Sequence, residues 1–549
     1  MFQKMHESYY FKIFKYIKYA KRDILFLILI TAIRVILNFP LPDAIQRFFD
    51  NMSSGNEGGF LTDIGLIVFL IVAGLLSGYI GSLRTQKIGY HLTLMIRSTL
   101  LKKVLSLPYK KLSALRTGDV VSRITGDSAV FKEYIMSVVI EPIISVILIV
   151  VYVIILMRLN LLLAIITLCS LPILSLVIKF YHKKTTDASF AYRDNYGILY
   201  NKLIELFNSM KLIKAMHFEE RHERQMNVYF NDVKDTGLKV EKLSIRSTFF
   251  SSLITNIGQL CVLIIGGYLT GKGEMTFAQF ISFYMFLQLA YAPIQSVTIA
   301  FASYQKGLGM LKRVFDILDT SSDEGANAGT KPVPDGDISV SGVDFAYTPD
   351  KKILNDFSCT FKANALNVVI GHSGVGKTTL MDLLLRLYAP EAGNIQIGGI
   401  DLKELASESF TDKIGVFTQE TVIFDGTIAE NIAYYKPNST HEEIVAAAEK
   451  AHIKDYIQTL ENGYDTLTGE RGNKLSGGER ARIALARIFL KEPEIIFMDE
   501  PTSNIDPQTK QVIYDSLKIL KEKSTIIMIA HKESAMAIAD NVIDMNQTS

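Results

Sequence analysis

The fold of the C-terminal part of the chain is decided by residues 366–378, which read LNVVIGHSGVGKT. The apolar residues 366–370 predict a short buried strand, and residues 379–387 predict a helix. The glycine-rich stretch between them has the pattern of a phosphate-binding loop, whose glycines let backbone N–H groups turn toward a phosphate at the positive end of the helix dipole. We therefore expect phosphate binding by Gly371, His372, Ser373, Gly374, Val375, Gly376, Lys377, Thr378 and Thr379.

Two side chains of this loop have separate expected tasks. Lys377 reaches the β- and γ-phosphates of a nucleotide, and the hydroxyl of Thr378 is a ligand for Mg²⁺. The pattern alone arises by chance in large sequence sets, but the strand before it and the helix after it make it specific.

A second apolar run, residues 494–500 with the sequence EIIFMDE, ends in two acids. Because side chains on a strand alternate between its faces, adjacent acids cannot perform the same task. We expect Asp499 to bind the magnesium ion and Glu500 to polarise the water that attacks the γ-phosphate. The alternative is a pair of solvated acids at a strand end. A central parallel strand argues against it, since α/β proteins bind ligands at the carboxyl edge of the sheet.

A third motif, LSGGE at residues 475–479, precedes a helical run at 480–490. Here the chain resembles the ABC transporter family, and the order of its motifs is similar to the exporter branch over nearly the whole chain. In that family the motif begins a helix whose N-terminus contacts the γ-phosphate of ATP bound to the other subunit. A helix N-terminus with two glycines suits that task. The resemblance therefore adds three nucleotide-binding residues, which are Ser476, Gly477 and Gly478.

The resemblance also implies roles for isolated positions. Tyr347 is similar to the aromatic residue that stacks on adenine, and Gln419 to the glutamine that touches Mg²⁺ and the attacking water. His531 is similar to the switch histidine at the γ-phosphate, and Asp506 to a residue of the loop that crosses the dimer interface. An ordinary strand tyrosine and a structural histidine are the alternatives. The segment TGERG at 468–472 resembles the one that touches the cytoplasmic turns of the membrane domain.

Two departures from the family pattern stand out. Glu479 ends the LSGGE motif where glutamine is commoner, and we expect the change to be tolerated because the serine and glycines carry the phosphate contact. The sequence stops at Ser549, where relatives usually continue into another hairpin strand and a helix. We expect a less supported C-terminal edge with unchanged chemistry.

The N-terminal part is dominated by long apolar runs. A helix needs about 20 mostly apolar residues to cross the hydrocarbon core of a bilayer. Six runs meet that requirement, at 24–39, 60–83, 134–157, 159–180, 250–269 and 277–301.

Charge predicts the orientation of these spans. Lys and Arg crowd the N-terminus and the long connections 84–132 and 179–246, whereas the short loops hold few. By the positive-inside rule, both termini and both long connections are cytoplasmic. Residues 9–21, which alternate aromatic, aliphatic and lysine residues, predict an amphipathic helix on the cytoplasmic membrane surface. Packing on soluble protein is the alternative for that helix.

The long connections show the apolar spacing of helices. We expect the spanning helices to continue past the membrane, turn near 117–119 and 204–218, and touch a cytoplasmic domain; a pore-lining or enzymatic role is the alternative. Polar residues inside spans are costly. Glu141 is expected to face a wet cavity, whereas helix-to-helix hydrogen bonds are at least as good an explanation for the amides Asn256, Gln259, Gln288 and Gln295.

Composition narrows the class of protein. The net charge of +2 gives no reason to expect nucleic acid as a partner. The cysteines Cys169, Cys261 and Cys359 are far apart and indicate neither disulfides nor a metal motif. A stretch without apolar periodicity predicts a linker at 320–337, between a transmembrane domain at 1–319 and a nucleotide-binding domain at 338–549. The expected fold class is an all-α six-helix transmembrane domain of the ABC exporter type joined to an α/β P-loop NTPase domain.

These expectations together describe a half-transporter with ATP and Mg²⁺ as cofactors. Since each LSGG motif would complete a site on another copy, we expect a homodimer; a heterodimer with a partly degenerate partner is the alternative. The expected location is the cell membrane, and the expected substrate is an amphipathic small molecule, peptide or lipid moved out of the cytoplasm or inner leaflet. A lipid flippase or an importer with the exporter fold remain alternatives.

Overall fold

The computed structural model describes residues 21–115, 117–321, 329–348, 351–503, 505–530 and 533–546. Apart from Lys21, the predicted helix at 9–21 lies outside these residues, and so does His531. The chain forms two compact units. We call Met1–Leu105 with Arg116–Thr320 the helical unit, and Ser106–Leu115 with Ser321–Ser549 the sheet unit.

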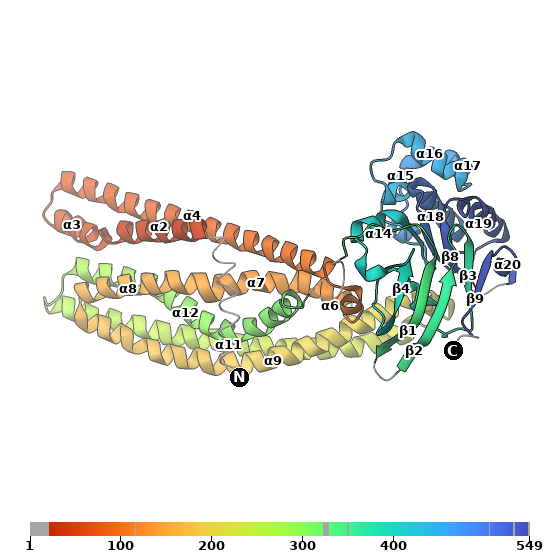
Figure 1. Cartoon of the computed structure of the whole chain (residues 1–549). Helices are drawn as coiled ribbons and strands as arrows, with labels where there is room; N and C mark the ends of the chain where they lie inside the picture. The colour runs from red at the N-terminus through yellow and green to blue at the C-terminus, as the bar shows by residue number, and fades with distance from the viewer. Residues whose placement is uncertain are drawn as a thin grey trace. The chain divides into compact units, whose positions relative to one another are not determined.

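The helical unit consists of long helices (Figure 1). In chain order they are α2 (Lys21–Asn38), α3 (Leu41–Ser53), α4 (Glu57–Leu105), α6 (Thr117–Ser122), the π-helix η1 (Arg123–Asp127), α7 (Ser128–Tyr134), the π-helix η2 (Ile135–Ile140), α8 (Glu141–Leu159), α9 (Leu161–Asn208), α10 (Met210–Ala215), α11 (Glu219–Gly271) and α12 (Phe277–Leu318).

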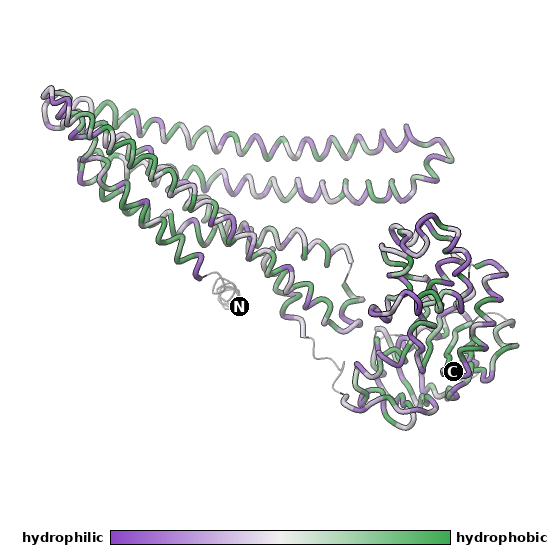
Figure 2. The backbone as a smooth tube through the Cα atoms, turned by 90° about the horizontal axis from the view of Figure 1, so that it is seen from above, coloured by the Kyte–Doolittle hydropathy of each residue, from purple (hydrophilic) through white to green (hydrophobic). Residues whose placement is uncertain are grey.

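Six helices of the described residues are long and apolar enough to cross a membrane, which confirms the predicted number. Figure 2 shows the hydrophobic stretches along these helices. The candidate spans are Lys21–Met52, Glu57–Leu105, Ile135–Leu159, Leu161–Asn208, Glu219–Gly271 and Phe277–Val297.

Three of these helices extend well beyond a bilayer's thickness. α4 has 49 residues, α9 has 48 and α11 has 53, against the roughly 20 that a span needs. The predicted continuation of the spans as helices is therefore confirmed. The first turn begins earlier than the predicted 117–119, because α4 ends at Leu105 and Pro108 starts the short helix α5 (Tyr109–Ser113). A residue before proline is disfavoured in the helical conformation, which ends α4 ahead of Pro108.

The polar residues predicted inside the spans have different surroundings. Gln259 of α11 donates a hydrogen bond from Nε2 to Oε1 of Gln288 of α12, at 3.1 Å. This pair supports the explanation of helix-to-helix bonding. Glu141 begins α8 directly after the π-helix η2, and its side chain is exposed within the single chain.

The sheet unit contains two sheets, the antiparallel one with the order β2-β1-β4-β5 and the parallel one with the order β6-β7-β8-β3-β9. The strands are β1 (Ile338–Thr348), β2 (Lys351–Phe361), β3 (Leu366–Ile370), β4 (Ala392–Ile397), β5 (Ile400–Asp401), β6 (Ile414–Phe417), β7 (Ile495–Asp499), β8 (Thr525–Ile529) and β9 (Asn541–Asp544).

The helices of the sheet unit are short by comparison. Besides α5 they are α13 (Lys377–Leu384), α14 (Ser407–Lys413), α15 (Ile428–Ile432), α16 (His441–Lys450), α17 (Lys454–Thr459), α18 (Gly477–Lys491), α19 (Pro507–Leu520) and α20 (Glu533–Met536), with short 3-10 turns at Leu402–Glu404, Ala433–Tyr435, Gly463–Asp465 and Glu470–Gly472.

The parallel sheet is buried on both faces, as expected for strands covered by helices. In β7, Ile496 and Met498 belong to one hydrophobic cluster, which includes much of α18. Ile495 and Phe497 belong to the opposite cluster, which includes residues of α13. This alternation confirms the predicted α/β domain.

The segment Ser106–Leu115 packs within the sheet unit. The ring of Tyr109 lies edge-on to that of Tyr388, with centroids 5.7 Å apart. Ser113 Oγ lies 3.1 Å from Tyr388 Oη, and Lys111 Nζ donates to the carbonyl oxygen of Ser321 at 3.2 Å and to its Oγ at 2.9 Å. The last part of the predicted linker also packs here, since Val333 is buried.

Candidate nucleotide-binding site

The phosphate-binding loop connects β3 to α13, as the sequence predicts. Gly376 is the N-cap residue of α13 and has a φ of 109°, in the region that favours glycine. A Cβ atom at this position would lie 3.0 Å from Cγ2 of Ile353 on β2. The loop is therefore packed against the antiparallel sheet at its last glycine, and a larger residue there would displace it.

Lys377 is almost completely buried at the start of α13. Its ammonium group donates hydrogen bonds to the carbonyl oxygens of Gly371, at 2.8 Å, and His372, at 2.9 Å. Burial lowers the pKa of Lys377, and the carboxylates of Glu500 and Asp499 counteract this. The cation therefore lies close to the two acids that end β7.

The carboxyl ends of neighbouring parallel strands bring the other predicted groups to this edge. Gln419 follows β6 and Glu500 follows β7, and Gln419 Nε2 donates to Glu500 Oε2 at 3.1 Å. Glu500 has a φ of 45°, which is strained for a residue with a side chain. Its N–H donates to the carbonyl oxygen of Ile529 at the end of β8, at 3.1 Å, so the neighbouring strand holds this conformation.

Tyr347, at the end of β1, is 46% exposed. Its hydroxyl lies 3.2 Å from Thr379 Oγ1 and donates to Asp382 Oδ2 at 3.2 Å. Both partners lie on α13, directly after the phosphate-binding loop. The arrangement anchors the polar tip of the ring beside the loop and leaves aromatic surface accessible, which suits stacking with a nucleobase. Asp382 was not predicted from the sequence.

The LSGGE motif begins α18, with Ser476 as the N-cap residue. Glu479 N–H donates to Ser476 Oγ at 3.3 Å, and Ser476 N–H donates to Glu479 Oε2 at 2.7 Å. This reciprocal pair is a capping box, which forms with either Glu or Gln at the third helical position. Glu479, the departure from the family pattern, therefore has a structural task that the commoner glutamine also fulfils.

Gly478 and Asp506 lie against each other. A Cβ atom on Gly478 would lie 2.9 Å from Asp506 Oδ2 and 2.7 Å from Thr509 Oγ1, so only glycine fits this approach of α18 to α19. Asp506 caps α19 by accepting from the Thr509 N–H at 2.8 Å, and the bonds from Thr509 lower the pKa of Asp506. Arg482 Nη1 donates to Thr509 Oγ1 at 2.8 Å and extends the set.

The predicted residues thus form two sets. The first gathers the loop, Tyr347, Gln419, Asp499 and Glu500 at the carboxyl edge of the parallel sheet. The second joins the start of α18 to the start of α19. Within the part of the chain that the structure describes, no hydrogen bond or ion pair of the second set reaches the first.

The structure adds one loop contact that sequence reasoning missed. Asn546 Oδ1, just after β9, accepts a hydrogen bond from the His372 N–H at 3.0 Å. β9 is the parallel neighbour of β3, so the rule that groups the carboxyl ends of strands would have indicated Asn546. The contact fixes the beginning of the phosphate-binding loop.

Hard oxygen donors at this edge fit a magnesium ion bound together with phosphate. Thr378 is exposed on the first turn of α13, and Asp499 is the last residue of β7. Among the described residues, no group of three His, Cys, Asp or Glu side chains is placed to hold a metal ion. Magnesium bound together with phosphate usually takes one or two carboxylates, phosphate oxygens and water as ligands.

Comparisons with known proteins identify the family. The description "ABC transporter transmembrane region" matches residues 24–294, and "ABC transporter" matches residues 354–503. An ATP-dependent lipid A-core flippase of Syntrophus aciditrophicus is 30% identical over 481 residues, which cover 87% of this chain and 79% of the flippase. A fatty acid ABC transporter ATP-binding/permease protein of Mycobacterium bovis is 29% identical over 448 residues, which cover 82% of this chain and 71% of that protein.

A solved structure shows the same architecture. The structure of a bacterial Atm1-family ABC exporter with ATP bound matches with a TM-score of 0.82 at 25% sequence identity, over 96% of this chain and 94% of that one. The chain is therefore a multi-pass membrane protein with an ATP-binding domain, and it belongs to the ABC transporter family. Within the family it is a half-transporter of the exporter type, with both domains fused in one chain.

Proposed function

We propose that this protein hydrolyses ATP, as a homodimer, to move an amphipathic small molecule, peptide or lipid out of the cytoplasm or the inner leaflet. The observation that carries the proposal is the pairing of Gln419 with Glu500 at the sheet edge, close to the buried ammonium group of Lys377. A carboxylate, an amide and a buried cation at the end of a phosphate-binding loop suit γ-phosphate hydrolysis.

The residues of one chain would divide the work as follows. Lys377 and the loop N–H groups bind the β- and γ-phosphates, and Tyr347 stacks on the base. Glu500 accepts a proton from the attacking water while the water oxygen bonds to the γ-phosphorus and the bond to the leaving ADP oxygen breaks. Gln419 orients the water, and His531 contacts the γ-phosphate. A magnesium ion held by Thr378, Asp499 and Gln419 would neutralise charge on the phosphates.

The second copy would supply the other half of the site. The start of α18, with Ser476, Gly477 and Gly478, presents a helix N-terminus suited to the γ-phosphate. Asp506, held against Gly478, would lie at the same interface. Contact with a partner's nucleotide would explain why a helix N-terminus with two glycines lies beside Asp506. ATP would then hold two sheet units together, and loss of the γ-phosphate would release them.

The distribution of charge supports the proposed orientation in the membrane, and the names of the relatives support the proposed substrate class. Positive residues in both termini and in the long connections 84–132 and 179–246 support a cytoplasmic location for the sheet unit and for these connections. The relatives reported above carry the names of a lipid A-core flippase and a fatty acid transporter. A lipid flippase is therefore the second candidate function, and an importer with this fold is the third.

Glu500→Gln tests the catalytic proposal in protein reconstituted into liposomes. We expect the variant to bind ATP with wild-type affinity and to lose nearly all turnover, because the amide cannot accept the proton of the water. The matched control is Glu522→Gln, the same change at an exposed position after α19. ATP hydrolysis by Glu500→Gln at the wild-type rate would refute the assignment. Vesicles that contain a fluorescently labelled phosphatidylethanolamine then distinguish a flippase from a pump of soluble molecules.

A further inference from the structure

The chain passes between its two units at three places. These are Leu105 to Ser106, Leu115 to Arg116, and Thr320 to Ser321. The second crossing leads from α5 into α6, and the third leads from α12 into the rest of the sheet unit. Motion of the sheet unit can reach the helical unit through these covalent connections and the groups that fix them.

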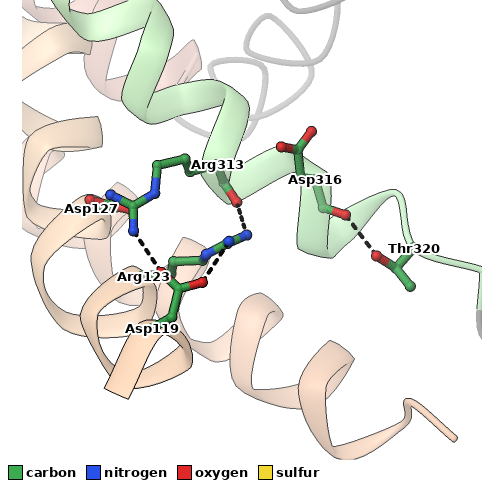
Figure 3. Close-up of polar contacts among 6 residues, drawn as sticks. All are labelled: Asp119, Arg123, Asp127, Arg313, Asp316 and Thr320. Carbon is green, nitrogen blue, oxygen red and sulfur yellow. Dashed lines mark hydrogen bonds and ion pairs between the residues drawn. The ribbon is translucent and has the colours of Figure 1, made fainter. Parts of the chain in front are cut away.

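Within the helical unit, four charged residues bond the segment after the second crossing to the end of α12 before the third crossing (Figure 3). Arg313 of α12 pairs with Asp119 of α6, with Nη2 and Oδ1 2.7 Å apart, and Arg123 Nη2 lies 2.6 Å from the other oxygen of Asp119. Arg313 Nε lies 3.5 Å from Asp127 Oδ2. Arg123 Nη1 also donates to the carbonyl oxygen of Arg313 at 3.0 Å. We call Asp119, Arg123, Asp127 and Arg313 the junction cluster.

Charge and burial hold the side chains of the junction cluster in a fixed orientation. The bonds from Arg123 and Arg313 lower the pKa of Asp119, so this carboxylate is ionised at neutral pH. Burial raises the pKa of Asp127, and the guanidinium groups of Arg313 and Arg123 counteract this. The side chain of Asp127 is only 10% exposed, so its contact with Arg313 is shielded from solvent more than a surface pair is. Charge-assisted bonds to a planar guanidinium also fix orientation.

The backbone around the junction cluster is unusual. Arg123–Asp127 forms the π-helix η1, a rare conformation that often marks functional positions. Arg97 of α4 donates to the carbonyl oxygen of Thr125, at 2.9 Å, and to Ser128 Oγ, at 2.8 Å. The end of α12 is closed by a bond from Thr320 Oγ1 to the carbonyl oxygen of Asp316, at 2.7 Å. Thus α4, η1 and α12 are connected by polar bonds next to the crossings.

A second connection lies on the other side of the same crossings. Within the sheet unit, Lys111 of α5 bonds both to the carbonyl oxygen and to the hydroxyl of Ser321. The chain segments at the second and third crossings are therefore bonded to each other in both units. The junction cluster bonds them in the helical unit, and Lys111 and Ser321 bond them in the sheet unit.

We propose that the junction cluster is a mechanical joint that makes the end of α12 and the segment from α6 to α7 (the first cytoplasmic arm) follow the sheet unit as one body. Arg313 and Asp119 are positioning residues for transport, not catalytic residues. This inference rests on the proposed function, since it concerns how nucleotide-driven closure of two sheet units reaches the membrane spans. Without the joint, closure of the sheet units would move α12 and the arm independently.

Arg313→Gln tests the joint with two readouts in the full-length protein in liposomes. Vanadate trapping of radiolabelled ATP reports closure of the sheet units. The distance between spin labels at residue 57 in the two copies, in a Glu57→Cys variant whose native cysteines are replaced, reports the response at the start of α4. We expect Arg313→Gln to trap nucleotide at the wild-type level and to lose most of the nucleotide-dependent distance change. Asp119→Asn should behave alike, and the double variant should be no worse than either single one.

The matched control is Lys312→Gln, which removes a positive charge from the neighbouring exposed position of α12. It should keep both readouts. A full distance change in Arg313→Gln, or an equal loss in Lys312→Gln, would overturn the joint. If Arg313→Gln does not fold, Arg313→Lys applies the same test, because a lysine keeps the charge but cannot contact both Asp119 and Asp127 through separate nitrogens. Failure of the unmodified protein to trap nucleotide would instead count against the proposed function.

Discussion

At the scale of single residues, Glu479 illustrates how local hydrogen bonding explains a departure from a family motif. Its carboxylate accepts from the Ser476 N–H, and its own N–H bonds to the serine hydroxyl. The box orients the first turn of α18, where the phosphate contact is proposed. A glutamine can make the same pair of bonds, whereas an alanine cannot.

Glu479→Gln should therefore keep the wild-type rate of ATP hydrolysis and the wild-type melting temperature. Glu479→Ala should lower the free energy of unfolding by about 0.3–1.5 kcal/mol through loss of the cap. Thermal unfolding followed by circular dichroism, alongside the ATPase rate, provides the measurement. A strong loss of activity in Glu479→Gln would mean that the negative charge itself is used.

The positions of residues in the fold were predictable where a motif carries them. The loop residues, Asp499 and Glu500 follow from spacing on strands whose ends meet. Asp382 acts through a hydrogen bond across the fold, and its sequence neighbourhood contains no pattern that marks it, whereas the rule on strand ends would have indicated Asn546. The strained backbone of Glu500 was equally hidden, because tertiary contact with Ile529 determines it.

At the scale of elements, β9 tests the expectation of a weakly supported C-terminal edge. Asp540 immediately precedes β9 and accepts from the Leu366 N–H of β3 at 2.8 Å. Lys521, which follows α19, donates to both carboxylate oxygens of Asp540, at 2.8 and 3.1 Å. The bond from Lys521 and the Leu366 N–H lower the pKa of Asp540. The edge strand is thus anchored at its start to β3 and α19.

Asp540→Asn should destabilise the protein in a pH-dependent way. A carboxyl group whose pKa is lowered by folding stabilises the folded state above its unfolded pKa, and that stabilisation is lost as the pH falls through the folded pKa. The difference in melting temperature between wild type and variant should therefore be constant from about pH 6 to 8 and shrink below about pH 4, near the ordinary aspartate pKa. Lys521→Gln should reproduce part of the loss. A difference that already changes between these neutral pH values would contradict the role of Asp540.

Elements with a strong period were predictable, and irregular ones were not. Long apolar runs predict the six spans because a bilayer imposes their length. The π-helices η1 and η2 were not predicted, since segments of 5 and 6 residues are too short to define a period of hydrophobic spacing. The turn after α4 lies ahead of the predicted Thr-Gly-Asp stretch because Pro108 disfavours helical conformation in the residue before it.

At the scale of the whole molecule, the proposed site is shared between copies, so complementary variants should rescue each other. Lys377→Ala removes the phosphate-binding cation, and Gly477→Asp places a negative charge at the helix N-terminus where the γ-phosphate is proposed to bind. Each homodimer should be inactive. A mixture that forms heterodimers should regain part of the ATPase rate, because one site then combines an intact loop with an intact α18.

The control pairs wild type with a chain that carries both changes, and in both cases the heterodimer is isolated through a different affinity tag on each chain. The control heterodimer has two damaged sites, so its rate should stay below that of the complementary heterodimer, which has one intact site. A higher rate in the control heterodimer would show that each chain completes its own site. ATP hydrolysis at full rate by a monomer in lipid would likewise remove the basis of the proposed mechanism.

The order of the domains was predictable because the sequence of the N-terminal part suits lipid and that of the C-terminal part suits water. The boundary between them was harder, since Ser106–Leu115 is remote in sequence from the sheet unit it packs in. Contact between Tyr109 and Tyr388 joins residues that no local pattern relates.

The inclusion of Ser106–Leu115 in the sheet unit has a consequence for swapping parts between transporters. A chimera cut only near residue 320 would separate Tyr388 from the short helix that covers it, and would pair that surface with a foreign loop. Grafts that exchange Ser106–Leu115 together with the C-terminal portion keep the contact between Tyr109 and Tyr388. Whether two swapped halves fit each other should therefore depend on the ten residues Ser106–Leu115 as well as on the fusion point.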